Sequence, residues 1–363
     1  MIASARLRPF VRTARASRHV FTPGIMVATR SQQKNKLAMT ASSTPPREMR
    51  TFKDVASLIS FKELAALKPE HGTAVIQLAL IVDISALERE VLERLLPALL
   101  TLTPNIIILT LWVYPPISTV SFARVPLPSL EVIRTNIPHR ALRPFVAFHP
   151  TLRALDIDAC GRARRCGLST LNIHQVNDIS CLVSCVPKLV HKDVERLRVA
   201  LDDTDVLMSA AISAFPISLH RLHVLTVDFA ANDKTILRVI ATNMPGIRNL
   251  KLLERCKANR HAARPWTDAT GWCAALKKLS QLDQLVVRTN GVLSTPDDRK
   301  AERELFHRWV GGKQLHSTLR YIAVWQRYND RDRGVISEWS REDGNWKGKW
   351  TEAPVASGFA MFD

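Results

Sequence analysis

The chain has 363 residues, of which 46% are hydrophobic, a composition that fits a folded globular protein and excludes a fully disordered or collagen-like one. The formal net charge of +18 is unevenly placed: residues 1–47 hold nine Lys or Arg and no acidic group, whereas the other 316 residues hold 42 basic and 33 acidic groups. No apolar run approaches the roughly 18 residues that a membrane span requires, so we expect no membrane-spanning segment.

Residues 1–49 are expected to form a disordered basic tail. They are rich in Arg, Ala and Ser, and on a helix Arg8, Arg12 and Arg15 would share one face. This composition is typical of a mitochondrial transit peptide, and a disordered leader without a targeting role is the alternative.

The six Cys form no dense framework, which indicates reduced thiols. We therefore expect a cytoplasmic or nuclear protein, with the mitochondrion as the alternative location.

Between residues 50 and 330 the sequence predicts short strands separated by amphipathic helices. Two segments, 152–160 and 282–290, fit the leucine-rich-repeat spacing L-x-x-L-x-L-x-x-N, with Cys160 and Asn290 at the position that bonds turn backbone. Partial copies predict strands at 75–80, 106–111, 130–133, 168–173, 194–199, 222–227, 247–252 and 319–324. The central apolar residues of all copies are Leu78, Leu109, Ile133, Leu155, Leu171, Leu197, Leu225, Leu250, Leu285 and Ile322.

The helices between these strands have recognisable ends. Ser85, with Glu88 three residues later, predicts a capping box at a helix start, and Thr295 followed by a proline predicts another start. The stretches 233–252 and 270–287 each contain a helix, a turn and the next strand. A strand, a helix and a parallel strand, repeated along the chain, form a β-α repeat.

A doubly wound sheet and a solenoid both satisfy this alternation. Strands of a doubly wound sheet are apolar on both faces, because helices cover both. Here polar residues alternate with apolar ones, as at Arg196 and Arg198 or at Asn249 and Lys251. One sheet face is therefore expected to meet water. The predicted fold is α/β: an irregular leucine-rich-repeat solenoid with parallel strands on the concave face and helices on the convex face.

Two stretches, 51–80 and 99–111, resemble a known family. The first predicts a short helix that leads to a strand, and the second contains P-N-I-I-I-L-T-L. Over residues 50–350 the chain resembles the leucine-rich-repeat region of fungal F-box/LRR-like proteins. The resemblance implies a horseshoe that recognises other proteins, often as the substrate adaptor of a ubiquitin ligase. The F-box should precede residue 50, where nothing matches its landmarks, so we expect no stable binding to a Skp-type linker.

Residues 331–363 are expected to form a Trp-bearing hairpin and a tail that close the solenoid. Asp343-Gly344 is the strongest short signal for a two-residue hairpin turn. Such a turn would pair Arg341 with Trp346, Trp339 with Gly348 and Glu338 with Lys349, and would place Trp339, Trp346 and Trp350 on one face. The last repeat of a solenoid exposes its core edge, so three indoles are expected to cap it. A ligand platform is the alternative.

Catalytic motifs are weak in this sequence. Asp156 and Asp158 could hold a nucleotide-bound metal, but in the repeat they flank an inward Ile157 and are expected to face solvent. The acidic stretch 202–205 could ligate a cation, and is expected instead to cap a helix. No nucleophile elbow or zinc-protease helix is present. We therefore expect neither an enzyme nor a cofactor.

The cysteines are expected to fill small core positions. They are Cys160, Cys166, Cys181, Cys185, Cys256 and Cys273, with His174 and His191 among the first four. A zinc cluster usually contains two tight pairs, and these spacings are loose. The sequence therefore favours buried, unmetallated thiols.

The function predicted from the sequence is protein recognition through the concave strand face. Candidate binding residues of alternating charge are Arg153, Asp156, Arg196, Arg198, Lys251, Gln284 and Arg288. The partner would be another protein, and the chain is expected to be monomeric. Nucleic-acid binding through the basic residues is the alternative, although the part beyond the tail is only mildly basic and shows no helix-turn-helix or aromatic stacking motif.

Overall fold

The computed structural model of the chain describes residues 47–118, 120–158, 160, 166–201, 207–215, 219–255, 263–291, 299–310, 316–328, 333–342 and 345–354. Several predicted features lie outside these ranges: the tail through residue 46, the stretch 202–205, Cys256, the helix start at Thr295 and the Asp343-Gly344 turn. Within the described part of the chain, no helix is long and apolar enough to cross a membrane.

One open sheet connects the whole described structure. Its thirteen strands are hydrogen-bonded in sequence order. Neighbours from β1 to β11 are parallel, whereas β12 and β13 join as an antiparallel pair. The strands are β1 (Glu48–Phe52), β2 (Val75–Asp83), β3 (Ile108–Tyr114), β4 (Val132–Thr135), β5 (Ala154–Ile157), β6 (Asp178–Leu182), β7 (Arg196–Ala200), β8 (Val224–Phe229), β9 (Asn249–Glu254), β10 (Gln284–Thr289), β11 (Tyr321–Tyr328), β12 (Arg333–Glu342) and β13 (Asn345–Pro354).

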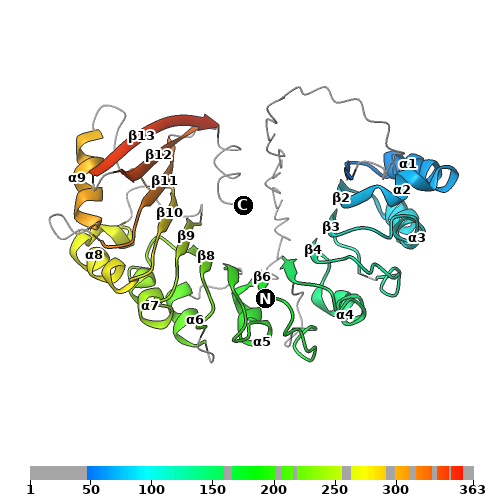
Figure 1. Cartoon of the computed structure of the whole chain (residues 1–363), viewed down its shortest axis with the longest axis horizontal. Helices are drawn as coiled ribbons and strands as arrows, with labels where there is room; N and C mark the ends of the chain where they lie inside the picture. The colour runs from blue at the N-terminus through cyan, green and yellow to red at the C-terminus, as the bar shows by residue number, and fades with distance from the viewer. Residues whose placement is uncertain are drawn as a thin grey trace, which may run out of the picture.

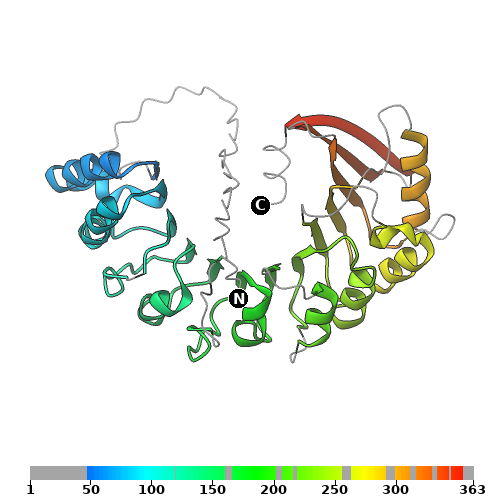
Figure 2. The same ribbon diagram turned by 180° about the vertical axis from the view of Figure 1, so that it is seen from behind.

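Helices cover one face of this sheet only. Figure 1 shows an open arc with the strands along its inner side and the helices along its outer side, and Figure 2 shows the same arrangement from behind. The helices are α1 (Val55–Leu67), α2 (Pro69–Thr73), α3 (Ala86–Leu102), α4 (His139–Phe148), η1 (Val183–Cys185), α5 (Val186–Leu189), α6 (Met208–Ser213), α7 (Ile236–Asn243), η2 (Pro265–Thr267), α8 (Ala269–Lys278) and α9 (Arg299–Trp309). The predicted α/β arrangement, with parallel strands inside and helices outside, is confirmed.

Nine of the ten predicted central apolar residues lie in a single row across the sheet, here called the core row. Its members are successive Cα partners, and each is at most 2% exposed. They are Leu78, Leu109, Ile133, Leu155, Ile179, Leu197, Leu225, Leu250, Leu285 and Ile322. All ten point toward the helices, because residues alternate between the two faces of a strand.

Two assignments from the sequence are wrong. The strand expected at 168–173 is absent, since this segment forms turns and irregular backbone. Its place is taken by β6, where Ile179 and not Leu171 joins the core row. The tail was expected to extend through residue 49, but Glu48 and Met49 belong to β1 and pair with β2. In β6 and in β1, polar residues in or next to the strand made the apolar pattern of a short strand hard to recognise.

A regular set of backbone hydrogen bonds, here called the backbone ladder, lies where each strand begins. One carbonyl accepts two successive N–H groups of the next unit, with distances of 2.8 to 3.2 Å. Asp283, for example, accepts from Arg320 and Tyr321, and Arg248 accepts from Asp283 and Gln284. The accepting residues are Ile107, Glu131, Arg153, Asn177, Glu195, His223, Arg248 and Asp283. Each follows directly after a fully or almost fully buried apolar residue.

Asparagine side chains bond the backbone of the preceding unit at two strand ends. Asn136, after β4, accepts the N–H of Val113 at 3.1 Å and donates to its carbonyl at 2.8 Å. Asn290, after β10, donates through Nδ2 to the carbonyl of Arg255 at 3.2 Å. The backbone N–H of Asn290 donates to the fully buried Glu254 at 3.2 Å. Asn290 therefore has the turn-bonding role that its position in the repeat predicts.

The helix starts and turns agree with their sequence signals where they are described. Ser85 and Glu88 form the predicted capping box at the start of α3, with the Ser85 N–H bonded to Glu88 at 2.8 Å and the Glu88 N–H bonded to Ser85 Oγ at 3.3 Å. The stretch 233–252 contains α7 and β9, and the stretch 270–287 contains most of α8 and then β10. These two predictions are confirmed.

The C-terminal hairpin extends the sheet beyond the last parallel strand and covers its core. Its register is the predicted one: Arg341 pairs with Trp346, Trp339 with Gly348 and Glu338 with Lys349. Trp339 is 1% exposed, pairs with Ile322 of the core row and packs against Phe306 of α9 with ring centroids 5.2 Å apart. The indole N–H groups of Trp339 and Trp350 donate to the buried Glu302 at 3.5 and 3.3 Å.

The core row makes a direct prediction about stability. Leu285→Ala should lower the free energy of unfolding by about 2–5 kcal/mol, because the removed atoms are fully buried. Gln284→Ala should stay within about 0.5 kcal/mol, because Gln284 is exposed on the other face. Denaturant unfolding measures both values. A costly Gln284→Ala together with a silent Leu285→Ala would show that the register is wrong.

Candidate functional site

The side chains that alternate with the core row form the concave surface. They lie in three rows that cross the strands. The middle row contains Thr110, Arg134, Asp156, Ser180, Arg198, Thr226, Lys251, Val286 and Ala323. Two positions earlier on each strand, a first row contains Ala154, Asp178, Arg196, Val224, Asn249, Gln284 and Tyr321. Two positions later, a last row contains Asp228, Leu253, Arg288 and Trp325.

Six of the seven residues predicted to bind a partner belong to this surface. Asp156, Arg198 and Lys251 lie in the middle row, Arg196 and Gln284 in the first row, and Arg288 in the last row. Arg153 lies in none of the three rows. It precedes β5, its carbonyl is part of the backbone ladder, and its side chain is exposed at the rim of the sheet.

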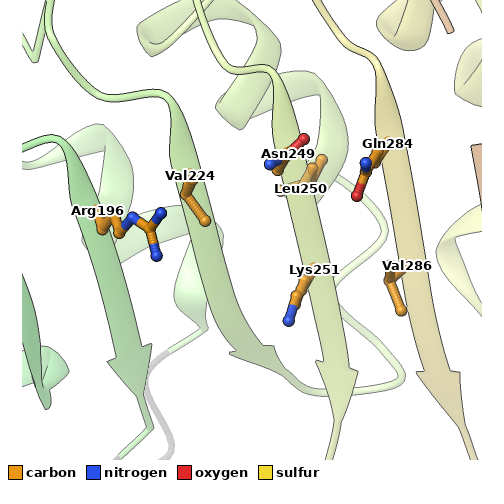
Figure 3. Close-up of a pocket in the computed structure, with 7 residues that line it drawn as sticks. All are labelled: Arg196, Val224, Asn249, Leu250, Lys251, Gln284 and Val286. Atoms are coloured by element: carbon orange, nitrogen blue, oxygen red, sulfur yellow. The ribbon is translucent and has the colours of Figure 1, made fainter. Parts of the chain in front are cut away.

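A hollow in the concave surface spans β7 to β10. Figure 3 shows its lining side chains on four neighbouring strands: Arg196, Val224, Asn249, Leu250, Lys251, Gln284 and Val286. Three of these are predicted site residues. The hollow therefore combines two cationic groups with amide and apolar side chains, a mixture that suits a polypeptide partner.

Acidic groups lie among the arginines of this surface. Burial raises the pKa of Asp178, and the charge of Asp156 raises it further, while Arg196 and Arg134 act in the opposite direction. These four side chains come from β4, β5, β6 and β7, so two neighbouring acidic strands lie between two basic ones.

A second acidic group lies toward the C-terminal half of the same surface. Burial also raises the pKa of Asp228, against the opposing charges of Arg288, Arg198 and Arg255. Sequence reasoning missed Asp178 and Asp228. Asp228 follows the alternation of residues 224–229 and could have been found, whereas Asp178 lies in the strand that was misplaced.

The C-terminal part of the concave surface is apolar. Leu253, Val286, Ala323, Trp325 and Ile336 form a buried cluster separate from the main core, with Tyr321 packed against it. The Tyr321 hydroxyl donates to Glu338 at 2.7 Å, and burial raises the pKa of this phenol. The concave side thus carries mixed charge over β4 to β8, whereas over β9 to β12 a buried apolar cluster lies beside Lys251 and Arg288.

The paired aspartates of residues 156–158 lie on either side of a core isoleucine. Ile157 is 1% exposed and belongs to the core, whereas Asp156 lies on the concave face and Asp158 is exposed after the strand ends. This agrees with the arrangement expected from the repeat.

The described cysteines only partly match the prediction. Cys166, Cys181 and Cys185 are buried, whereas Cys160 and Cys273 are half-buried. Contrary to the expectation from their loose spacing, Cys160, Cys166 and Cys185 converge, and they do so on His139. The Cys185 thiol, and then the His139 ring, lower the pKa of Cys166 to about 4.

The two histidines noted in the sequence lie elsewhere. His174 and His191 are stacked edge to face with ring centroids 5.2 Å apart. Nε2 of His191 lies 2.9 Å from the carbonyl of Val176, and its Nδ1 accepts the N–H of Asp193 at 3.3 Å. Both ring nitrogens of His191 are therefore occupied by backbone groups.

The raised pKa of Asp228 predicts how stability depends on pH. The folded state holds this proton to a higher pH than the unfolded chain does, so the carboxyl lowers stability as pH rises from the ordinary Asp value of 3.8 through the raised value. Asp228→Asn should therefore raise the thermal midpoint at about pH 7, and the difference should vanish in acid. The exposed Asp83→Asn should change little. A less stable Asp228→Asn at neutral pH would show that the arginine contacts outweigh burial.

Neighbouring strands from β3 to β11 thus supply a single concave surface, with mixed charge in its middle and a buried apolar cluster toward its C-terminal end. The surface includes six of the seven predicted binding residues. Comparison of the chain with protein-family models found no matching family, and comparison with curated proteins found no matching sequence.

Proposed function

We propose that this protein is a leucine-rich-repeat scaffold that recognises another protein through its concave surface. The repeat assignment is supported by the core row, the backbone ladder and the turn-bonding Asn290. The recognition role is supported by one observation above others. The strand face that the helices leave uncovered carries charged side chains on hydrogen-bonded strands, among them the exposed Arg196 and Arg198.

The composition of this surface favours a protein over a nucleic acid as the partner. Arginine and aromatic residues are the commonest energetic centres of protein interfaces. The concave arginines alternate with Asp156, Asp178 and Asp228, whose charges would repel phosphate. Alternating charge selects a complementary protein surface and fixes its orientation.

Substrate recognition for a ubiquitin ligase is the specific role that the resemblance to F-box/LRR-like proteins favours. In this proposal the concave surface holds the substrate, and a ligase component other than a Skp-type linker attaches elsewhere on the chain.

Charge reversal on the concave face tests the recognition role. Arg196→Glu with Arg198→Glu should abolish capture of the partner from cell extract, since both side chains are exposed on β7. Arg238→Glu with Lys277→Glu, which changes exposed groups on α7 and α8 by the same charge, should leave capture unchanged. Quantitative mass spectrometry of the captured proteins, followed by binding of the purified candidate, makes the comparison.

Two results would contradict protein recognition through this surface. One is identical capture by the wild-type chain and the β7 variant. The other is binding dominated by nucleic acid, with an affinity that falls steeply with salt as phosphate contacts require.

The link to a ligase has its own test. Because residues 1–49 lack F-box landmarks, a purified Skp-type linker should not form a stable complex with the full chain in size-exclusion chromatography. A stoichiometric complex would overturn this expectation. It would then assign the F-box role to the α1–α2 region, and substitution of the exposed Leu67 would locate the contact.

A further inference from the structure

Four metal-ligating side chains meet at one edge of the sheet. His139 begins α4 shortly after β4 ends, Cys160 follows β5 by three residues, and Cys185 follows β6 by three residues. The carboxyl ends of neighbouring parallel strands meet at the same edge, so these residues come together although they are distant in sequence. Cys166, from the segment between β5 and β6, is the fourth member.

The ligand atoms have the spacing of a tetrahedral site. Nδ1 of His139 lies 3.2 Å from Sγ of Cys166 and 3.7 Å from Sγ of Cys185, and all four ligand atoms lie within 4.8 Å of one another. Zinc bonds of about 2.3 Å to sulfur and about 2.0 Å to nitrogen place tetrahedral N and S ligands about 3.5 Å apart. The two measured N–S distances lie on either side of that value.

The buried histidine has no conventional partner. His139 is 0% exposed, and within the described structure its Nε2 has no hydrogen-bond partner, while the contacts of Nδ1 are the two sulfurs. Buried polar side chains in proteins are normally satisfied by hydrogen bonds. A cation held by Nδ1 and the thiolates would account for the approach of Nδ1 to two sulfurs, whereas both ring nitrogens of His191 meet backbone groups.

Gly167 allows the close approach that brings Cys166 to the cluster. A Cβ at this residue would lie 2.5 Å from Cα and 2.6 Å from N of Arg140 in the first turn of α4. Any larger residue would push the segment that carries Cys166 away from His139. The glycine at position 167 therefore lets the backbone next to Cys166 pack closely against α4, which carries His139.

Little of the described chain between β5 and β7 is helical. Residues 166–177, which lead from the cluster to β6, form turns and irregular backbone, and the helix after β6 is the four-residue α5. A bound metal would tie the ends of β4, β5 and β6 together where few helical side chains can do so. Metal ions commonly supply such stability where a core is small.

We propose that His139, Cys160, Cys166 and Cys185 bind one structural zinc ion. Three thiolates and one imidazole in tetrahedral arrangement are a preferred zinc ligand set. Four protein ligands leave no open position for a substrate, and three of the four residues are buried, so the ion has a structural and not a catalytic role. This site is separate from the concave surface and does not depend on the partner.

The test uses the full chain, purified under reducing conditions without added metal. Elemental analysis should find one zinc per chain, and replacement with Co²⁺ should give the absorption of tetrahedral thiolate-bound cobalt. Cys166→Ala and Cys185→Ala should each weaken metal binding by more than the 10–100-fold that changes around a ligand shell typically cost. Cys181→Ala removes a buried cysteine of β6 outside the cluster, and it should retain the metal.

Three outcomes would overturn the proposal. The first is a wild-type chain that contains no zinc and gives no tetrahedral cobalt spectrum, a result that does not depend on the folding of any variant. The second is equal metal content in the wild-type chain and in Cys166→Ala and Cys185→Ala. The third is a disulfide within the cluster in the reduced preparation, shown by mass spectrometry of peptides.

Discussion

The architecture depends on how each strand begins. At eight successive positions, a single backbone carbonyl accepts two neighbouring N–H groups of the next unit, and this satisfies polar backbone at the sheet edge. The accepting residue lies between two buried side chains in the spacing L-x-x-L, as Asp283 lies between Leu282 and Leu285. Because a slip by one residue would turn every core side chain toward water, this arrangement fixes the register. The helices can vary in length, and the interval between successive accepting residues ranges from 18 residues (177 to 195) to 35 residues (248 to 283).

This constraint explains which parts of the fold the sequence predicts. The L-x-x-L spacing persists even where the rest of the repeat is lost, so nine of the ten core-row positions and the hairpin register could be identified. The strand β6 was missed because Asp178 and Ser180 flank its single core-row residue, while the turn at 168–173 imitates the pattern with Leu168 and Leu171. β1 was missed because the adjoining basic tail dominates the local composition. The alternation of polar residues predicted the concave surface well, apart from Arg153, which precedes its strand.

Chemistry that arises from several strands was harder to predict. The spacing of His139, Cys160, Cys166 and Cys185 is loose along the chain, yet each of three strands contributes one ligand just beyond its carboxyl end. Only the order of strands in the sheet shows that these three positions lie next to one another. The same applies to the charges of Arg134, Asp156, Asp178 and Arg196, which belong to four neighbouring strands. Burial raises the pKa of Asp178 and Asp228, so these carboxylates lower stability at neutral pH. Both carboxylates lie on the surface that we propose binds a partner. Stability lost at a binding surface is a common cost of recognition.

Amide hydrogen exchange of the wild-type chain tests the backbone ladder most directly. Both members of each donating pair, such as Arg248 and Asn249 or Arg320 and Tyr321, should exchange as slowly as amides inside the strands, although the first of each pair precedes its strand. Exchange at the rate of exposed loops at these positions, with protection confined to the strand interiors, would contradict the account.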